Sequence, residues 1–180
     1  MTYPELIETA RLVLRWATES DAEELFARCT SDPSVTLYLL WPPHQTVDET
    51  REFIRTRVTE REAGNACGWT IRLKSDHSVI GSIGCRHVEP HVVQFGYYVA
   101  QSAWGNGYAT EATTAVVPIW LTNPEVWRVQ AFCDPENIAS ARVLAKSGLQ
   151  HEGTLRRHVL SPNLCCEPRD AHLFAAIRED

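Results

Sequence analysis

The sequence predicts a mixed α/β (α+β) fold built around one sheet. Three strand-like segments, residues 67–73, 79–88 and 92–99, follow one another with short polar turns, which favours an antiparallel meander. A helical segment then leads to a further strand, and a helical crossover after a meander is typical of a sheet of mixed direction. The chain has 180 residues, of which 44% are hydrophobic and 22% charged. That composition suits an ordinary globular protein, so we expect residues 1–180 to form a single domain.

The N-terminal segment predicts a strand and then a helix. In residues 11–16, Leu12 and Leu14 alternate with their neighbours, which indicates a strand. Ser20 and Glu23 have the spacing of a capping box, in which each satisfies backbone N–H groups at a helix start. We therefore expect a first helix from this point.

A proline-rich loop and a second helix come next. Residues 32–45 contain three prolines and are expected to form a loop with several apolar side chains. Thr46 and Glu49 repeat the capping-box spacing. Apolar residues at helical spacing follow, and Gly64 is suited to end the helix.

The C-terminal half alternates helices with strands. A helix is predicted over residues 107–121, with a kink in its last turn at Pro118. A short helix ended by Gly148 is expected later in the chain. The remaining predicted elements are a strand at 126–133, that short helix at 137–147, and strands at 149–160 and 169–177.

Net charge argues against one class of partner. There are 17 Lys and Arg against 23 Asp and Glu, giving a net charge of −6. A general nucleic-acid binder needs a basic surface to displace counterions from phosphates, so no nucleic-acid partner is expected.

No apolar run reaches the roughly 18 residues of a membrane span. The first ten residues lack the pattern of a signal peptide, so no membrane partner and a cytoplasmic location are expected.

The cysteines do not predict a metal site. None of the six forms a CxxC pair, so we expect reduced thiols, several of them buried, and no zinc. They are Cys29, Cys67, Cys85, Cys133, Cys165 and Cys166.

A glycine loop is the most informative stretch for function. Gly105 and Gly107 lie between the strand at 92–99 and the helix at 107–121. Glycine allows a tight turn and close approach to a ligand, and a helix start offers unpaired N–H groups, so the loop suits a pyrophosphate. The alternative is an ordinary helix start with two turn glycines. The spacing matches neither GxxxxGK[ST] nor GxGxxG, which removes the main support for ATP or NAD.

A second segment begins at Asn137, directly before a short helix, with Ser140 one turn further on. Asn is a favoured helix N-cap, worth about 1 kcal/mol, and that role alone would explain it.

Together these two segments resemble the GNAT acetyltransferase superfamily. The superfamily's acetyl-CoA loop reads Q/R-x-x-G-x-G/A, and here Gly107 and Ala109 take the last two places and Trp104 the first. The form Trp-Gly-Asn-Gly-Tyr-Ala-Thr-Glu-Ala most resembles the branch with ribosomal-protein N-terminal acetyltransferases. The segments at 8–15 and 137–149 match that branch too, so the resemblance covers nearly the whole chain.

The resemblance implies a mixed seven-stranded sheet with helices on both faces and the fourth and fifth strands splayed. Acetyl-CoA, as co-substrate, would insert its pantetheine arm there, and no metal is implied. Asn137 would hold the pantetheine or fix the following loop, and an amide near Val99 would stabilise the oxyanion. Backbone groups of Tyr97, Tyr98 and Val99 would bond the pantetheine. The pyrophosphate would lie on the amides of Gly105, Asn106, Gly107, Tyr108, Ala109 and Thr110.

The implied reaction is direct attack of a primary amine on the thioester. The acceptor would be the N-terminal amine of a protein or peptide, or a small amine. It would lie opposite the CoA, near Tyr38, Trp41, His44 and residues 160–168. Members often form homodimers, so a homodimer is one expected state. The alternative function is a non-catalytic acyl-CoA-binding regulatory domain.

The chain departs from the family pattern at the acid and the base. The tyrosine that many members place seven residues after the Asn is Leu144 here, so Ser140 is the predicted catalytic acid; the alternative is a solvated helix residue. Gln94 stands near the position of a frequent Glu and cannot act as a base. Other base candidates are His87, Glu89, His91, Glu111 and His158, and the choice stays open.

Overall fold

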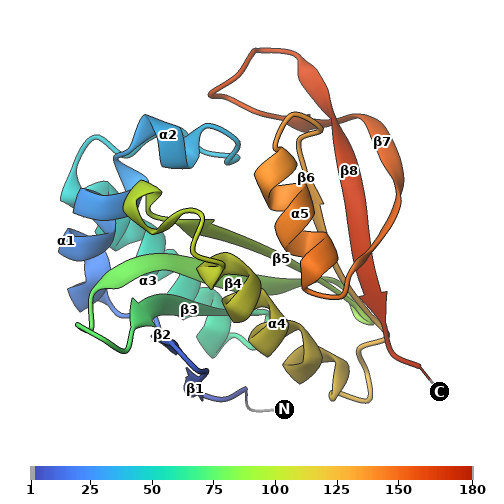
Figure 1. Cartoon of the computed structure of the whole chain (residues 1–180), viewed down its shortest axis with the longest axis horizontal. Coiled ribbons are helices and arrows are strands. Elements are labelled where there is room, and N and C mark those ends of the chain that lie inside the picture. Colours follow the sequence, from blue (N-terminus) through green and yellow to red (C-terminus); the bar gives the residue numbers. More distant parts are fainter. Residues whose placement is uncertain (1–2, 180) are drawn as a thin grey trace.

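The computed structural model describes residues 3–179, which form an eight-stranded sheet in the order β1-β2-β3-β4-β5-β6-β8-β7 (Figure 1). The pairs β1–β2, β2–β3, β3–β4, β4–β5, β6–β8 and β7–β8 are antiparallel, whereas β5 and β6 are parallel. The predicted fold class is confirmed. The prediction of seven strands missed the three-residue β1. The strands are β1 (Leu6–Glu8), β2 (Leu12–Trp16), β3 (Ala66–Leu73), β4 (Val79–Glu89), β5 (Val92–Val99), β6 (Arg128–Cys133), β7 (Gln150–Leu160) and β8 (Pro168–Ile177).

The helices follow the expected order with local differences. They are α1 (Ala22–Leu25), α2 (Pro33–Thr36), α3 (Val47–Glu62), α4 (Tyr108–Leu121) and α5 (Ile138–Lys146). The predicted first helix is α1 continued by a π-helical turn over Phe26–Thr30. The expected loop at 32–45 contains α2, because the Asp32 carboxylate accepts from the Ser34 N–H at 2.8 Å and a proline occupies the first helical position. The predicted Thr46 cap is confirmed by its bond from the Glu49 N–H at 3.3 Å.

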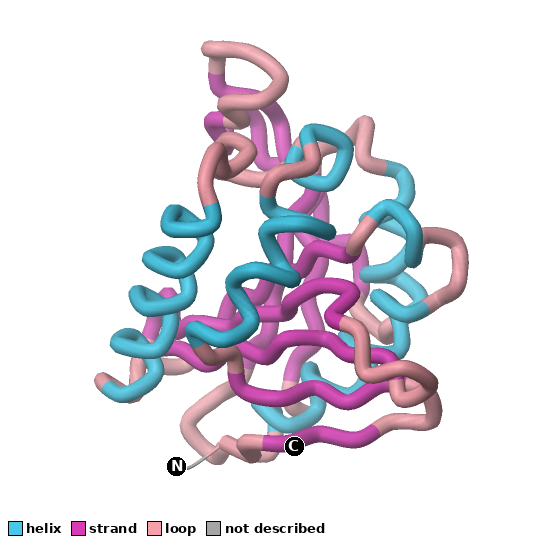
Figure 2. The backbone as a smooth tube through the Cα atoms, turned by 90° about the vertical axis from the view of Figure 1, so that its left-hand side faces the viewer, coloured by secondary structure: helices cyan, strands magenta, loops and turns pink. Residues whose placement is uncertain are grey.

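Helices cover both faces of the sheet, as Figure 2 shows. The larger buried cluster joins Trp69 and Val93 of the sheet to Val116 of α4. The other cluster lies under α1 and α3 and includes Leu25 and Ile54. Because neighbouring residues of a strand face opposite sides, Tyr97 packs with the first cluster and Tyr98 with the second.

The sheet opens between β5 and β6. The two strands pair only from Val92 with Arg128 to Gln94 with Gln130. Beyond that point β5 stays paired with β4 as far as Val99. The free edge of β5 and the end of β6 diverge toward α5 (Figure 1), so the predicted splay is confirmed.

All six cysteines are free, and the prediction that several are buried is confirmed, since only Cys165 and Cys166 are exposed. Burial raises the pKa of the Cys29 thiol to about 12. Within residues 3–179 no group of three or more His, Cys, Asp or Glu side chains is placed to hold a metal ion. Of the helices in this part of the chain, none has the length and apolar character needed to cross a membrane.

Candidate active site

A cavity of about 1080 Å³ runs through the splay and is lined from both faces of the sheet. On one side it reaches α4 and α5, and on the other it reaches Trp41 and Phe53. Of the predicted cofactor residues, Asn106 is the one that does not line it. The predicted residues that do line it are Tyr97, Tyr98, Val99, Gly105, Gly107, Tyr108, Ala109, Thr110, Asn137 and Ser140.

The free edge of β5 offers backbone groups to the cavity. The Ala100 N–H donates to the Ile80 carbonyl of β4 at 2.7 Å. Because backbone groups of successive residues point to alternate sides of a strand, those of Tyr98 also face β4. The backbone groups of Tyr97 and Val99 therefore face the splay. Of the three residues predicted to bond the pantetheine, Tyr97 and Val99 therefore have backbone groups that can reach a ligand there, and Tyr98 does not.

Trp104 leaves Val99 with one free backbone group. Its indole Nε1 donates to the Val99 carbonyl at 2.7 Å, so the Val99 N–H is the group that remains toward the splay. Asn106 has a structural role in the same loop, because its Nδ2 donates to the Trp104 carbonyl at 3.0 Å. The loop is therefore held in shape by its own side chains.

The glycine loop ends at the start of α4 with unpaired amides. Gly105 and Gly107 have φ of +76° and +79°, in the left-handed region where side chains other than glycine are strained. The Glu111 N–H makes the first bond of the helix, to the Gly107 carbonyl at 3.0 Å. The amides of residues 108–110 precede that bond and have no acceptor within the helix. Together with the helix dipole, they form a site suited to an anion.

The N-terminal segment clamps this loop. The Glu111 carboxylate accepts from the Thr9 hydroxyl at 2.6 Å and from the Arg11 N–H at 2.8 Å. The Arg11 guanidinium also bonds this carboxylate at 2.7 Å, donates to the Asn106 carbonyl at 2.9 Å and stacks on the Tyr108 ring. Burial tends to raise the pKa of Glu111, but the hydrogen bonds from Thr9 and Arg11 together lower it. Glu111 is therefore a weak base with a structural role.

Glu111→Gln should lower the melting temperature at pH 7. A carboxylate whose pKa is lowered by folding stabilises the protein above its unfolded pKa, about 4.3, and this contribution is lost as the pH falls further. The difference in melting temperature from the wild type should therefore shrink below about pH 4.3, as thermal melts from pH 3 to 7 would show. Glu62→Gln, at an exposed position of α3, is the control. A pH-independent difference would contradict the role given to the Glu111 charge.

Asn137 is a helix cap with a spare amide group. Its Oδ1 accepts from the Ser140 N–H at 3.0 Å, which confirms the capping role. Its Nδ2 makes no hydrogen bond to any residue in 3–179, and the residue lines the cavity. The amide can therefore donate to a ligand while the oxygen caps α5.

Asn137→Asp separates these two roles. Asp caps as well as Asn, so the melting temperature should change little. The carboxylate loses the donor and adds negative charge near an anionic ligand, so we expect about tenfold weaker acetyl-CoA binding by titration calorimetry, or 1.4 kcal/mol. Undiminished affinity in a folded Asp variant would leave capping as its whole function.

Ser140 lies in a small group of protic side chains, in which Tyr97 is half-buried and Cys133 is buried. Its hydroxyl is 3.0 Å from the Tyr97 hydroxyl, which reaches across the splay from β5. Cys133, at the end of β6, lines the same cavity. Burial raises the pKa of Tyr97 to about 12 and that of Cys133 to about 11, so both keep their protons at neutral pH. Ser140 is thus half-buried and hydrogen-bonded, and Cys133 is a poor nucleophile.

The other base candidates lie away from the cavity, since His87, Glu89, His91 and His158 are not among its lining residues. The carboxylates that line the cavity are Asp134 and Asp170. Sequence reasoning missed both. Neither lies in a recognisable motif, and the sheet brings them to the cavity from β8 and from the end of β6.

Asp134 is already neutralised. Arg169 donates to its two carboxylate oxygens at 2.6 and 3.1 Å, and the Glu136 N–H adds a bond at 2.9 Å. Burial tends to raise the pKa of Asp134, but the bond from Arg169 and its positive charge lower it overall. Asp134 is therefore a structural anion and a weak base.

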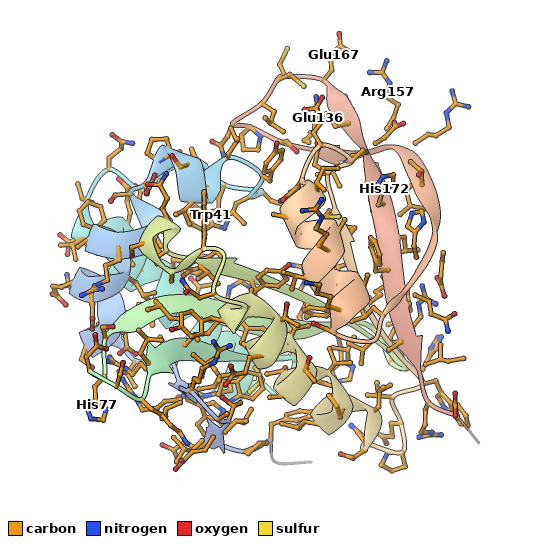
Figure 3. All side chains as sticks on the ribbon, in the orientation of Figure 1. Trp41, His77, Glu136, Arg157, Glu167 and His172 are labelled. Atoms are coloured by element: carbon orange, nitrogen blue, oxygen red, sulfur yellow. The ribbon has the colours of Figure 1, made fainter. Side chains whose placement is uncertain are left out.

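Aromatic side chains line the end of the cavity opposite α4. The Trp41 ring lies 5.5 Å from the Phe53 ring and 5.8 Å from the Tyr98 ring. Figure 3 shows Trp41 below α2, and Arg157 and Glu167 on the β7–β8 hairpin at the top of the view. Of the three side chains predicted here, Tyr38 and Trp41 line the cavity, whereas His44 packs behind Trp41.

The β7–β8 loop is tied to this aromatic segment by one side chain. The Asn163 Nδ2 donates to the carbonyls of Thr36 at 2.7 Å and Trp41 at 2.9 Å. The two segments that frame the predicted acceptor region therefore form one wall.

A sheet opened at its parallel pair, with a glycine-bounded helix start beside the gap, forms a site suited to a long thin ligand that carries an anionic group. The comparisons with known proteins give the family. A family model described as "Acetyltransferase (GNAT) domain" matches residues 11–150. The chain therefore belongs to the GNAT acetyltransferase family, as its motifs predicted.

Similar proteins extend over the same length. The chain is 31% identical to the uncharacterized N-acetyltransferase p20 of Bacillus licheniformis, over 98% of each chain. It is 29% identical to the uncharacterized N-acetyltransferase YoaA of Bacillus subtilis, over 96% of this chain and 97% of that one. The structure of RimL, a ribosomal L7/L12 alpha-N-protein acetyltransferase, in complex with coenzyme A shares the fold with a TM-score of 0.85. That likeness covers 96% of this chain and 98% of RimL at 21% identity.

Proposed function

We propose that the protein transfers the acetyl group of acetyl-CoA to a primary amine, either the N-terminal amine of a protein or peptide or a small amine. One observation carries this proposal. The unpaired edge of β5 and the unpaired amides at the start of α4 line the same cavity. These are the groups that a pantetheine amide chain and a pyrophosphate would each need.

The donor would lie along β5 and α4. The backbone groups of Tyr97 and Val99 would bond the pantetheine as an added strand does, and the amides of residues 108–110 would hold the pyrophosphate. Arg142 and Lys146, one turn apart on α5, line the same side of the cavity and add positive charge. The coenzyme A bound by RimL, which has the same fold, supports this placement.

The reaction needs alignment more than activation. The Val99 N–H would stabilise the negative charge that forms on the thioester oxygen when the amine attacks. As the carbon–sulfur bond breaks, the departing thiolate would take the proton of the Ser140 hydroxyl. An unperturbed thiol has a pKa of about 8.5, so this help is useful but not essential.

The acceptor would enter from the opposite face, along the wall that the Trp41 segment forms with the β7–β8 loop. The region is aromatic on one side and bounded by Asp134 and Asp170 on the other. An amine with an apolar body next to its nitrogen fits such a lining.

Two measurements test the proposal. Titration calorimetry with acetyl-CoA measures donor binding, and thiol release measures turnover with short peptides of varied first residue and with spermidine. We expect micromolar binding and turnover with at least one amine. Acetyl-CoA binding without thiol release above the amine-free rate would instead indicate a non-catalytic acyl-CoA-binding domain.

A further inference from the structure

We propose that Asp170 binds the cationic acceptor amine and takes a proton from it before attack. This proposal rests on the proposed acetyl transfer, and assigns the base that the sequence left open. It is carried by an irregularity in β7, by the bond that orients the Asp170 carboxylate, and by the charge balance of the cavity.

β7 bulges directly opposite Asp170. Leu155 pairs with Ala171 and Val159 with Arg169, so three residues of β7, 156–158, oppose Asp170 alone. Bulges of this kind re-aim side chains next to active sites. Here the bulge replaces the regular ladder at the one position of β8 where a carboxylate lines the main cavity.

The bulge orients the carboxylate. Arg157, in its centre, has φ of +51°, a left-handed conformation that is strained for arginine. Its N–H donates to Asp170 Oδ1 at 2.9 Å. Strained backbone persists only where the surroundings maintain it, and it clusters at functional sites. Oδ2 makes no hydrogen bond to residues 3–179 and is left for a ligand.

Asp170 is the carboxylate of the cavity whose charge is not compensated. Asp134 is paired with Arg169, whereas Asp170 takes part in no ion pair within residues 3–179. Arg157, in the centre of the bulge, is paired with Glu167 at 2.9 Å. Asp170 also lines a smaller cavity, together with other titratable and charged side chains. These are Glu136, Arg156, Arg157, Cys165, Glu167 and Arg169.

An exposed carboxylate at this place can accept the proton that the acceptor amine must lose before it attacks. A primary amine arrives as an ammonium ion, which the negative charge attracts. One proton passes from the ammonium to Asp170 and then to solvent, and the freed lone pair forms the carbon–nitrogen bond while the carbon–sulfur bond breaks. The second proton, lost as the amide forms, replaces the one that Ser140 gives to the thiolate. The sum is one amide, one free CoA thiol and one released proton.

Asp170→Asn tests the charge without removing the anchor, because the Asn oxygen can still accept from the Arg157 N–H. With the best amine of the panel, we expect kcat/KM at pH 7 to fall about 100-fold. The deficit should shrink toward pH 9.5, where the amine loses its proton unaided. Acetyl-CoA affinity should stay unchanged. Glu89→Gln is the control, because this exposed carboxylate lines neither cavity and takes part in no ion pair within residues 3–179, and it should change kcat/KM less than twofold.

Two results would overturn the role of Asp170 as the base, and they can be told apart because only one of them also overturns the proposed acetyl transfer. If the wild type turns over and the folded Asp170→Asn variant matches it from pH 6.5 to 9.5, Asp170 only anchors the bulge and the proposed function stands. If the wild type binds acetyl-CoA but acetylates no amine, the proposed function fails and the assignment fails with it. Asp170→Glu guards against misfolding of the Asn variant, and recovery of part of the pH 7 rate would confirm the need for a carboxylate.

Discussion

Gly107→Val is expected to weaken acetyl-CoA binding about 10- to 100-fold, or 1.4 to 2.7 kcal/mol, in a protein that still folds. Gly107 caps α4 at φ of +79°, a conformation that costs other residues about 1–2 kcal/mol. An added Cβ would meet Arg11 Nη2 at 3.6 Å, an ordinary contact, so the loop itself has room for it. The branched side chain would instead occupy the space in front of the amides where the pyrophosphate is expected.

Gly64→Val is the matched control for that variant. Gly64 follows α3 at φ of +76° with open space around it, so the variant carries similar backbone strain at a position that does not line the cavity. Calorimetric titration should show normal acetyl-CoA affinity for Gly64→Val and reduced affinity for Gly107→Val. Equal affinities in the two folded variants would remove the pyrophosphate from this loop.

Ser140→Ala should lower kcat up to about 100-fold while acetyl-CoA binds normally. General acid catalysis is worth about 10²–10⁴-fold, and the low end or less is expected because a thiolate leaves readily and water can substitute. The deficit should grow at high pH, where solvent supplies protons poorly. Alanine favours helix, so α5 should stay intact. Steady-state kinetics from pH 6 to 9, with a melting curve, make this measurement.

The controls for Ser140→Ala come from its surroundings. Ser147→Ala changes a serine just beyond the other end of α5 and should leave kcat unchanged. Tyr97→Phe removes the hydroxyl bonded to Ser140 and should lower kcat less than Ser140→Ala, because it leaves the proposed donor in place. A Ser140→Ala variant with wild-type kcat across this pH range would leave bound water as the acid.

Local rules predicted the features that local residues determine. The Thr46 and Asn137 caps and the meander follow from side chains within a few residues of one another. α2 also had a local signal, an Asp before a Pro, but the prolines nearby favoured a loop. β1 has three residues, too few for an alternating pattern to be recognised.

Long-range geometry explains what the sequence could not predict. Tyr97 and Ser140 are 43 residues apart, and their contact depends on the angle at which β5 leaves β6. The clamp of Glu111 by Arg11 spans 100 residues. The orientation of Asp170 depends on a bulge in the partner strand, and no pattern of residue types specifies it.

The passage of the cavity through the sheet bears on the order of events in the proposed reaction. In the proposed reaction the donor would enter beside α4 and the acceptor below α2, at opposite ends of a cavity lined from both faces of the sheet, so neither would have to leave before the other arrives. Both substrates would then be held at once around the reacting carbon, and the proposed reaction would need no acetylated form of the enzyme to carry the group between them. Spent coenzyme can likewise depart on its own side while the acetylated product leaves on the other. Under the proposed function, the early end of the β5–β6 pairing would therefore determine the order in which substrates bind and products leave.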